Sequence, residues 1–117
     1  LFGYHYKGRT HSSFWESAPI REMNPNELWL NPVDAKSRNI VTGDTVLAFN
    51  QYGTIRLVAK VTPKIMPGVS TCPQGGWYKL ENGIDVGGCI NTLTTLEPTA
   101  ISKGNPQHSV LVEIRKA

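Results

Sequence analysis

The chain has 117 residues, of which 39% are hydrophobic, and this length and composition suit one folded domain with a single core. No segment is apolar for long enough to span a bilayer, which argues against direct membrane insertion. The formal charge of +3 comes from lysines and arginines scattered along the chain, so it fits an anionic partner and an ordinary solvated surface equally well.

The amino-terminal quarter is predicted to begin as a strand and continue as loops. Leu1–Tyr6 is apolar and aromatic, and because no methionine or cleavable leader precedes it, we expect a fragment of a longer protein. Lys7–Ser13 is a dense run of cationic, imidazole and hydroxyl side chains that could donate hydrogen bonds to phosphate or carbonyl oxygens. An ordinary surface loop is the alternative. Phe14–Asn26 contains two prolines and little periodicity, which predicts an irregular segment.

A short strand and a short helix are predicted next. Glu27–Leu30 has the character of a strand. Asn31 can cap a helix, and Pro32 suits its first position because no amide hydrogen is needed there. We expect this helix to end near Arg38 or Asn39.

A tight turn and a β-hairpin are predicted to follow the helix. Gly43 can supply the positive φ of the turn, and the Asp44 carboxylate can accept a hydrogen bond from nearby backbone amides. Thr45–Phe49 and Ile55–Val61 are the predicted strands, joined by a turn at residues 50–53. One face of the second strand should be buried, formed by Ile55, Leu57, Ala59 and Val61.

The segment after the hairpin is rich in glycine and aromatic residues. Val69–Cys72 is a predicted short strand, and the paired glycines within Pro73–Tyr78 allow backbone to approach a ligand or another strand closely. Lys79–Val86 is polar and predicted to be turn-like. Cys72 and Cys89 match no compact metal spacing, so we expect two buried thiols rather than a disulfide or a metal site.

The last third contains one more segment with binding chemistry. Gly87–Thr95 combines glycines, Asn91 and several hydroxyl residues, and an asparagine amide can pair with the edge of a pterin or guanine. An Asx turn is the alternative. Pro98–Gln107 is a predicted loop, and Ser109–Arg115 a predicted closing strand.

Catalytic signatures are missing from the sequence. It contains no nucleophile elbow, HExxH motif, P-loop or GxGxxG motif, and its three histidines suit no standard zinc pattern. Carboxylates are too dispersed to indicate an acid–base pair. We therefore assign no catalytic residue and no metal ligand, and we expect this segment alone to be inactive.

Several motifs together carry a family resemblance. The stretches LFGYHYKGRTHSS, WLNPVDAKSRNIVTGDTVLAFNQYGTIRLVAKVTPKIMPGV, QGGWY, GGCINTLTT and KGNPQHSVLVEI occur here in order. They resemble the carboxyl-terminal region of the dimethyl sulfoxide reductase family of molybdopterin oxidoreductases. The similarity is greatest to the catalytic subunits of the bacterial anaerobic, membrane-associated group, and it covers nearly the whole chain.

The resemblance implies a single molybdopterin dinucleotide-binding domain over residues 1–117, the last domain of a larger subunit. Its implied fold is mainly β with short helices, a double-psi β-barrel of the aspartate-decarboxylase-like class. The implied cofactor is molybdenum held by two molybdopterin guanine dinucleotides, with an iron–sulfur cluster elsewhere in the subunit. The implied partners are the other domains, an iron–sulfur electron-transfer subunit and a membrane anchor, with the enzyme exported to the periplasmic face of the membrane.

The resemblance also implies which residues contact the cofactor, whereas the metal's protein ligand would lie in another domain. The predicted contacts are Arg9, Thr10, His11, Ser12, Gln74, Trp77, Asn91, Thr92, Asn105 and Gln107.

Three functions follow as hypotheses. The first is cofactor binding in an enzyme that reduces S- or N-oxides such as dimethyl sulfoxide. The second keeps the domain but places it in a selenate or other oxyanion reductase. The third is a stand-alone β-barrel module that binds nucleic acid or protein, which would need an exposed basic and aromatic stripe. The even spread of charge argues against this third hypothesis.

Overall fold

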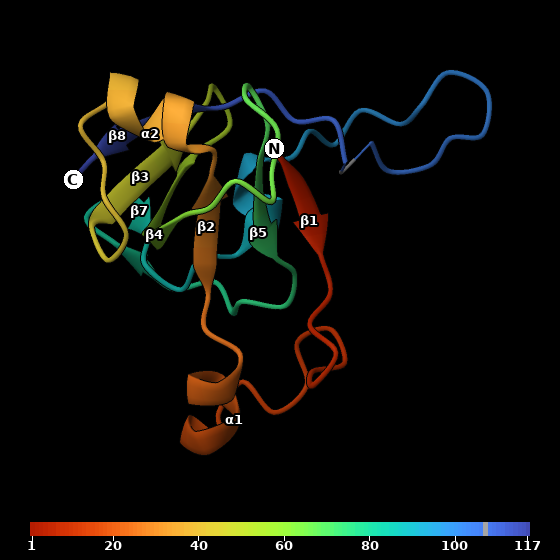
Figure 1. The fold of residues 1–117 in the computed structure, drawn as a ribbon. Coiled ribbons are helices and arrows are strands. Elements are labelled where there is room, and N and C mark those ends of the chain that lie inside the picture. Colours follow the sequence, from red (N-terminus) through yellow and green to blue (C-terminus); the bar gives the residue numbers. More distant parts are fainter. Residues whose placement is uncertain (107) are drawn as a thin grey trace.

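The computed structural model describes residues 1–106 and 108–117. Its main feature is a curved mixed sheet in which the strands follow the order β1-β5-β2-β4-β3-β8, while β7 pairs with β4 and β6 pairs with β7 (Figure 1). The strands are β1 (Phe2–Tyr4), β2 (Glu27–Leu30), β3 (Thr45–Phe49), β4 (Thr54–Val61), β5 (Ser70–Pro73), β6 (Leu80–Glu81), β7 (Ile84–Asp85) and β8 (Glu113–Lys116). The short helices are α1 (Ala18–Met23), α2 (Pro32–Ser37) and the 3-10 helix η1 (Ile90–Leu93). This composition confirms the predicted mainly β class with short helices.

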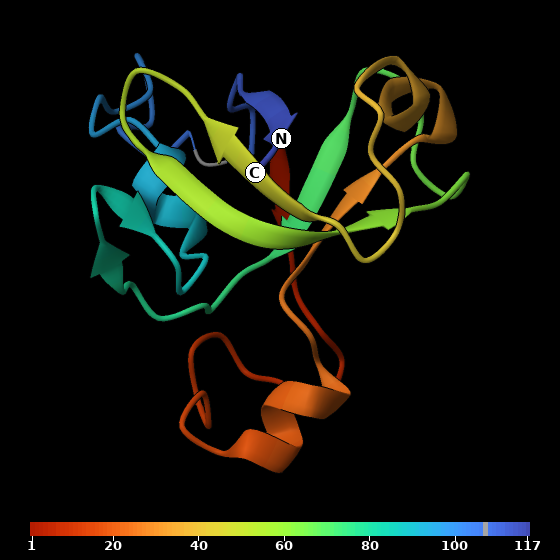
Figure 2. The ribbon, with the colours of Figure 1, turned by 90° about the vertical axis from the view of Figure 1, so that its left-hand side faces the viewer.

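The hairpin of β3 and β4 forms the long curved centre of the sheet (Figure 2). In β4, Ile55, Leu57 and Ala59 are buried and alternate with more exposed residues, as predicted from the sequence, whereas Val61 on the same face is only partly buried and packs against the core. Strand β2 pairs with β4 in parallel and with β5 antiparallel. This mixed pairing is consistent with a double-psi β-barrel. The core cluster collects apolar residues from several strands and from η1, including Leu28, Leu30, Val46, Ile55, Cys72, Leu93 and Ile114.

Helix α2 begins where the sequence predicts. The Asn31 side chain accepts a hydrogen bond from the Val33 amide at 2.9 Å, and Pro32 occupies the first turn. In the turn that follows, Gly43 has φ +94°, and Asp44 accepts a hydrogen bond from the Val41 amide at 3.0 Å. These contacts confirm the predicted helix cap and turn.

Two segments contain regular structure that the sequence did not predict. Residues 14–26 include helix α1, which buries none of its residues and therefore leaves no helical period in the sequence. The expected turn at residues 79–86 contains the small hairpin of β6 and β7. Its tip is Asn82-Gly83, with φ of +51° and +78°, which is a favoured hairpin dipeptide.

The closing strand is shorter than predicted. Strand β8 begins only at Glu113 because the upstream Val110 exchanges backbone hydrogen bonds with Leu1 instead of pairing with β3. Val110 and Ile114 are nevertheless buried, and Val112 packs against the core. The alternation of Val110, Val112 and Ile114 in the sequence predicts that these residues face inward, and the structure confirms it.

None of the described helices is long and apolar enough to cross a membrane.

Candidate functional site

Two loops that are far apart in the sequence meet beyond the ends of β1 and β5. The Arg9 Nη2 atom donates to the Gln74 carbonyl at 2.6 Å, and the Trp77 indole nitrogen donates to the Ser12 carbonyl at 2.9 Å. Gly75 lies against the His11 carbonyl so closely that a side chain at position 75 would collide with it, and its φ is +95°. A glycine is therefore required where the two loops touch.

A cavity of about 360 Å³ lies where these loops meet the segment at η1. It brings together four of the residues predicted from the sequence, namely His11, Ser12, Gln74 and Asn91. The other lining residues are Gly75, Gly76, Cys89 and Ile90. The side chains offer an imidazole, a hydroxyl and two amides, so they can both donate and accept hydrogen bonds. Such a set suits a polar heterocycle or phosphate oxygens.

Asn91 also lines a second cavity of about 320 Å³. This cavity is formed by residues 94–98 and 103–106, and it includes the predicted residue Asn105 together with Lys103 and Glu97. Asn91 thus lines both cavities, and it is an exposed residue. The remaining predicted residue of this loop, Gln107, lies outside the described residues.

Arg9 is held inside the loop junction. Only 6% of the residue is exposed, and its guanidinium carbon lies 5.5 Å from the Tyr6 ring centroid and 5.3 Å from that of Trp15. Burial lowers the pKa of Arg9 below its ordinary value. Its Nη1 atom is buried without a hydrogen-bond partner among the described residues. Arg9 therefore joins the two loops and keeps one unused donor.

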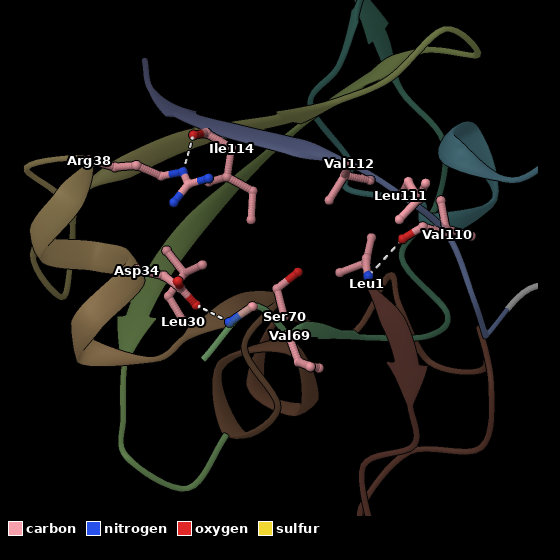
Figure 3. Close-up of a pocket in the computed structure, with 11 residues that line it drawn as sticks. Leu1, Leu30, Asp34, Arg38, Val69, Ser70, Val110, Leu111, Val112 and Ile114 are labelled. Carbon is pink, nitrogen blue, oxygen red and sulfur yellow. Dashed lines mark hydrogen bonds between the residues drawn. The ribbon is translucent and has the colours of Figure 1, made fainter. Parts of the chain in front are cut away.

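A separate small cavity of about 120 Å³ lies between α2, β2 and the last strand (Figure 3). Its two charged side chains are already used in structural contacts: Asp34 accepts a hydrogen bond from the Gly68 amide, and Arg38 donates to the Ile114 carbonyl. None of the predicted cofactor-contacting residues that the structure describes lines it. We therefore assign this cavity to the packing of the barrel.

Comparison with known proteins identifies the family. Residues 1–111 match the family model described as "Molydopterin dinucleotide binding domain". The chain belongs to this family. Among curated relatives, YnfE of Escherichia coli is 52% identical and dimethyl sulfoxide reductase DmsA of Haemophilus influenzae is 46% identical, each over 99% of this chain. Trimethylamine-N-oxide reductase 1 of Escherichia coli is 32% identical over 92% of this chain.

These relatives are much longer, because this chain spans only 14–15% of their length. Among solved structures, acetylene hydratase from Pelobacter acetylenicus superimposes with a TM-score of 0.80 over 100% of this chain and 18% of its own. At 16% identity this match shows a shared fold. It agrees with the mainly β architecture described above.

The residues around the two cavities fit a molybdopterin dinucleotide. Such a ligand presents the edges of a pterin and of a nucleobase, which need paired donors and acceptors, and a pyrophosphate, which needs donors. The amides of Gln74 and Asn91 can pair with the ring edges, and His11 and Ser12 can donate to the pyrophosphate oxygens. The buried Nη1 of Arg9 is one more donor still without a partner.

Besides Arg9, three described contact residues predicted from the sequence line neither of these two cavities, namely Thr10, Trp77 and Thr92. The Thr92 hydroxyl donates to Asp85 at 2.9 Å and is therefore committed to the protein. Trp77 lines a different open groove, together with Trp15 and Tyr78. Thr10 is exposed and lines none of the cavities described above, and its carbonyl accepts a hydrogen bond from the Ser13 amide. Direct contact of these residues with a cofactor stays a prediction.

Asp85 is a residue of the site that the sequence analysis missed. It is completely buried at the end of β7, and its carboxylate accepts four hydrogen bonds. The polar composition of Lys79–Val86 predicts only a turn, and it gives no role to the single aspartate of this segment. The signal was its position just before the Gly87-Gly88 pair, where free backbone amides need an acceptor.

The two thiols differ in their surroundings. Cys72 is buried in the core, and burial raises its pKa to about 12. Cys89 is only partly buried and lines the first cavity, so the prediction of two buried thiols was wrong for this residue. Both are free cysteines. No group of three or more histidine, cysteine or acidic residues within 1–106 and 108–117 could hold a metal ion.

Proposed function

We propose that this domain binds molybdopterin guanine dinucleotide as part of a molybdenum oxidoreductase that reduces S- or N-oxides such as dimethyl sulfoxide. The observation that carries the proposal is the cavity in which His11, Ser12, Gln74 and Asn91 converge from three separate segments. The names of the relatives support the substrate class, because they include dimethyl sulfoxide and trimethylamine-N-oxide reductases. Since the chain spans a small part of each relative, the reaction itself belongs to a larger protein.

The role of this chain is to bind and orient. The Asn91 amide, with donor and acceptor side by side, would pair with a pterin or guanine edge, and Gln74 offers a second amide. His11 and Ser12 would donate to phosphate oxygens. When bound, the cofactor supplies the oxygen-atom transfer and the two-electron reduction at molybdenum. None of the described residues is assigned a catalytic role.

The proposal extends to the surroundings of the domain, on the basis of the sequence resemblance. It includes two guanine dinucleotides for each molybdenum, an iron–sulfur cluster elsewhere in the subunit, an electron-transfer subunit and a membrane anchor. It places the enzyme on the periplasmic face of the membrane. Purification of the native polypeptide under anaerobic conditions, with measurement of its mass, molybdenum, iron and released nucleotide, tests the cofactor, the cluster and the size of the subunit. Identification of the subunits that purify with it and cell fractionation test the partners and the location.

The binding site is tested by Asn91→Ala in the full-length native polypeptide that contains these residues. We expect a lower molybdenum content and less guanine nucleotide released on acid hydrolysis, with the polypeptide still folded. Ser37→Ala is the matched control, because Ser37 lies on α2, makes only exposed side-chain hydrogen bonds, to the Asp34 carbonyl and from Arg38, and lines neither cavity. Full cofactor loading of Asn91→Ala would remove Asn91 from the site. Reduction of selenate instead of S- or N-oxides by the loaded enzyme would refute only the proposed substrate.

A further inference from the structure

The Asp85 carboxylate is the centre of a hydrogen-bond cluster beside the first cavity. One of its oxygens accepts from the amides of Lys79 and Gly87 at 2.9 and 3.0 Å, and the other from the Cys89 amide and the Thr92 hydroxyl at 2.8 and 2.9 Å. All four donors are neutral, and the residue has 0% exposure. A buried carboxylate is stable only when its oxygens are satisfied in this way. The cluster therefore depends on each of its partners.

Asn91 is fixed from both sides by this cluster. Its neighbours Cys89 and Thr92 are held by the same carboxylate oxygen of Asp85, and its own carbonyl accepts from the amide and the hydroxyl of Thr94. The Asn91 side chain, in contrast, is exposed between the two cavities and has no hydrogen-bond partner among the described residues. The backbone is anchored while the amide is left available for a ligand.

We propose that Asp85 is a positioning residue whose carboxylate holds residues 87–92 so that the Asn91 amide faces the cofactor cavity; this inference rests on the proposed function. Gly87 and Gly88 would otherwise make this segment flexible, and ordering it on binding would reduce affinity. With Asp85 in place the segment is ordered before the ligand arrives. Asp85 thus acts on the ligand through Asn91 without touching it.

The test is a double-mutant cycle in the full-length holoenzyme. The variants are Asp85→Asn, Asn91→Ala and the two combined, and the measurement is the rate at which the folded holoenzyme loses molybdenum and guanine nucleotide after dilution. Asp85→Asn keeps the size of the side chain but replaces one acceptor oxygen by a donor. We expect each single variant to lose the cofactor about tenfold faster, as for other residues that orient a ligand-binding group. The double variant should lose it no faster than Asp85→Asn alone.

Two further variants separate positioning from general stability. Thr92→Val removes one donor to Asp85, so it should share the faster loss, whereas Thr92→Ser keeps the hydroxyl and should restore retention. Asp44→Asn is the control, because Asp44 also accepts a turn amide but lines neither cavity. It should lower the melting temperature without changing the rate of cofactor loss. If Asp85→Asn does not fold, Thr92→Val takes its place in the cycle.

Each outcome decides between the proposals. If Asn91→Ala loses the cofactor faster but Asp85→Asn and Thr92→Val do not, the positioning role is wrong and the binding site stands. If the effects of the two substitutions multiply in the double variant, Asp85 acts only through overall stability and the positioning role is again wrong. If both single variants keep the cofactor as the unaltered enzyme does, the proposed function of this site is refuted.

Discussion

Asn31→Ala should destabilise the domain strongly although Asn31 touches no ligand. The side chain accepts from the Val33 amide at 2.9 Å and donates to the Ile65 carbonyl at 2.7 Å, and the residue is only 8% exposed. Alanine removes a helix cap, which costs about 1 kcal/mol, and leaves a buried carbonyl unpaired, which brings the total to about 2–4 kcal/mol. For a domain of this size the melting temperature should fall by about 8–20 °C.

Urea unfolding of the 117-residue chain, followed by circular dichroism, measures this loss. Asn31→Asp keeps the acceptor for the Val33 amide but places an acceptor oxygen against the Ile65 carbonyl, so it should retain the cap and destabilise the domain through the buried contact. Ser37→Ala, on the same helix, removes two exposed hydrogen bonds, one to the Asp34 carbonyl and one from Arg38, and should change stability by less than about 0.5 kcal/mol. If Asn31→Ala were no more destabilising than Ser37→Ala, the cap and the buried contact would not stabilise the domain as argued.

Other predictions concern reactivity, pH and backbone conformation. Burial raises the pKa of both thiols, so alkylation should be slow at neutral pH and faster at alkaline pH; mass spectrometry of the folded chain should find Cys89 labelled before Cys72. The hydrogen bond from the Val41 amide, and to a smaller extent the contact with Lys116, hold the pKa of Asp44 below its ordinary value of 3.8. Its contribution to stability is therefore complete above pH 3.8 and lost as pH falls further, and the difference in melting temperature between the unaltered chain and Asp44→Asn should close in that range. Gly75→Ala should separate the two loops, because the new methyl group would collide with the His11 carbonyl, and backbone hydrogen exchange in both loops should become faster. Gly83→Ala is the comparison: its methyl group meets no other atom, so it should lower stability only through the strain of its positive φ, by about 1–2 kcal/mol.

The motif that carries the family resemblance could predict the barrel because its residues have local, structural roles. Asn31 caps a helix, Gly43 adopts a positive φ and Asp44 accepts a turn amide. Such roles depend on neighbours in the sequence and can be read from it. The same residues line neither of the two candidate cavities.

The candidate site could be predicted only in part because its residues come from separate segments. The chemistry of His11, Ser12, Gln74 and Asn91 was visible in the sequence, but their convergence required the fold. The sequence predicts that Arg9 contacts the cofactor, which stays a prediction, but it does not show that aromatic rings enclose Arg9 at the loop junction. Its partner Gln74 lies 65 residues away, a distance at which no local pattern operates.

The pairing of β1 with β5 has a consequence for the order of folding. The β3–β4 hairpin joins neighbouring strands, whereas Phe2 and Thr71 meet across 69 residues, so closing that loop has the larger entropic cost. The loops that enclose the first cavity extend from β1 and β5 and come together only when these strands pair. A ligand in that cavity would therefore bind only chains whose sheet is complete. Cofactor loading would then select molecules with a complete sheet and stabilise the pairing of β1 with β5.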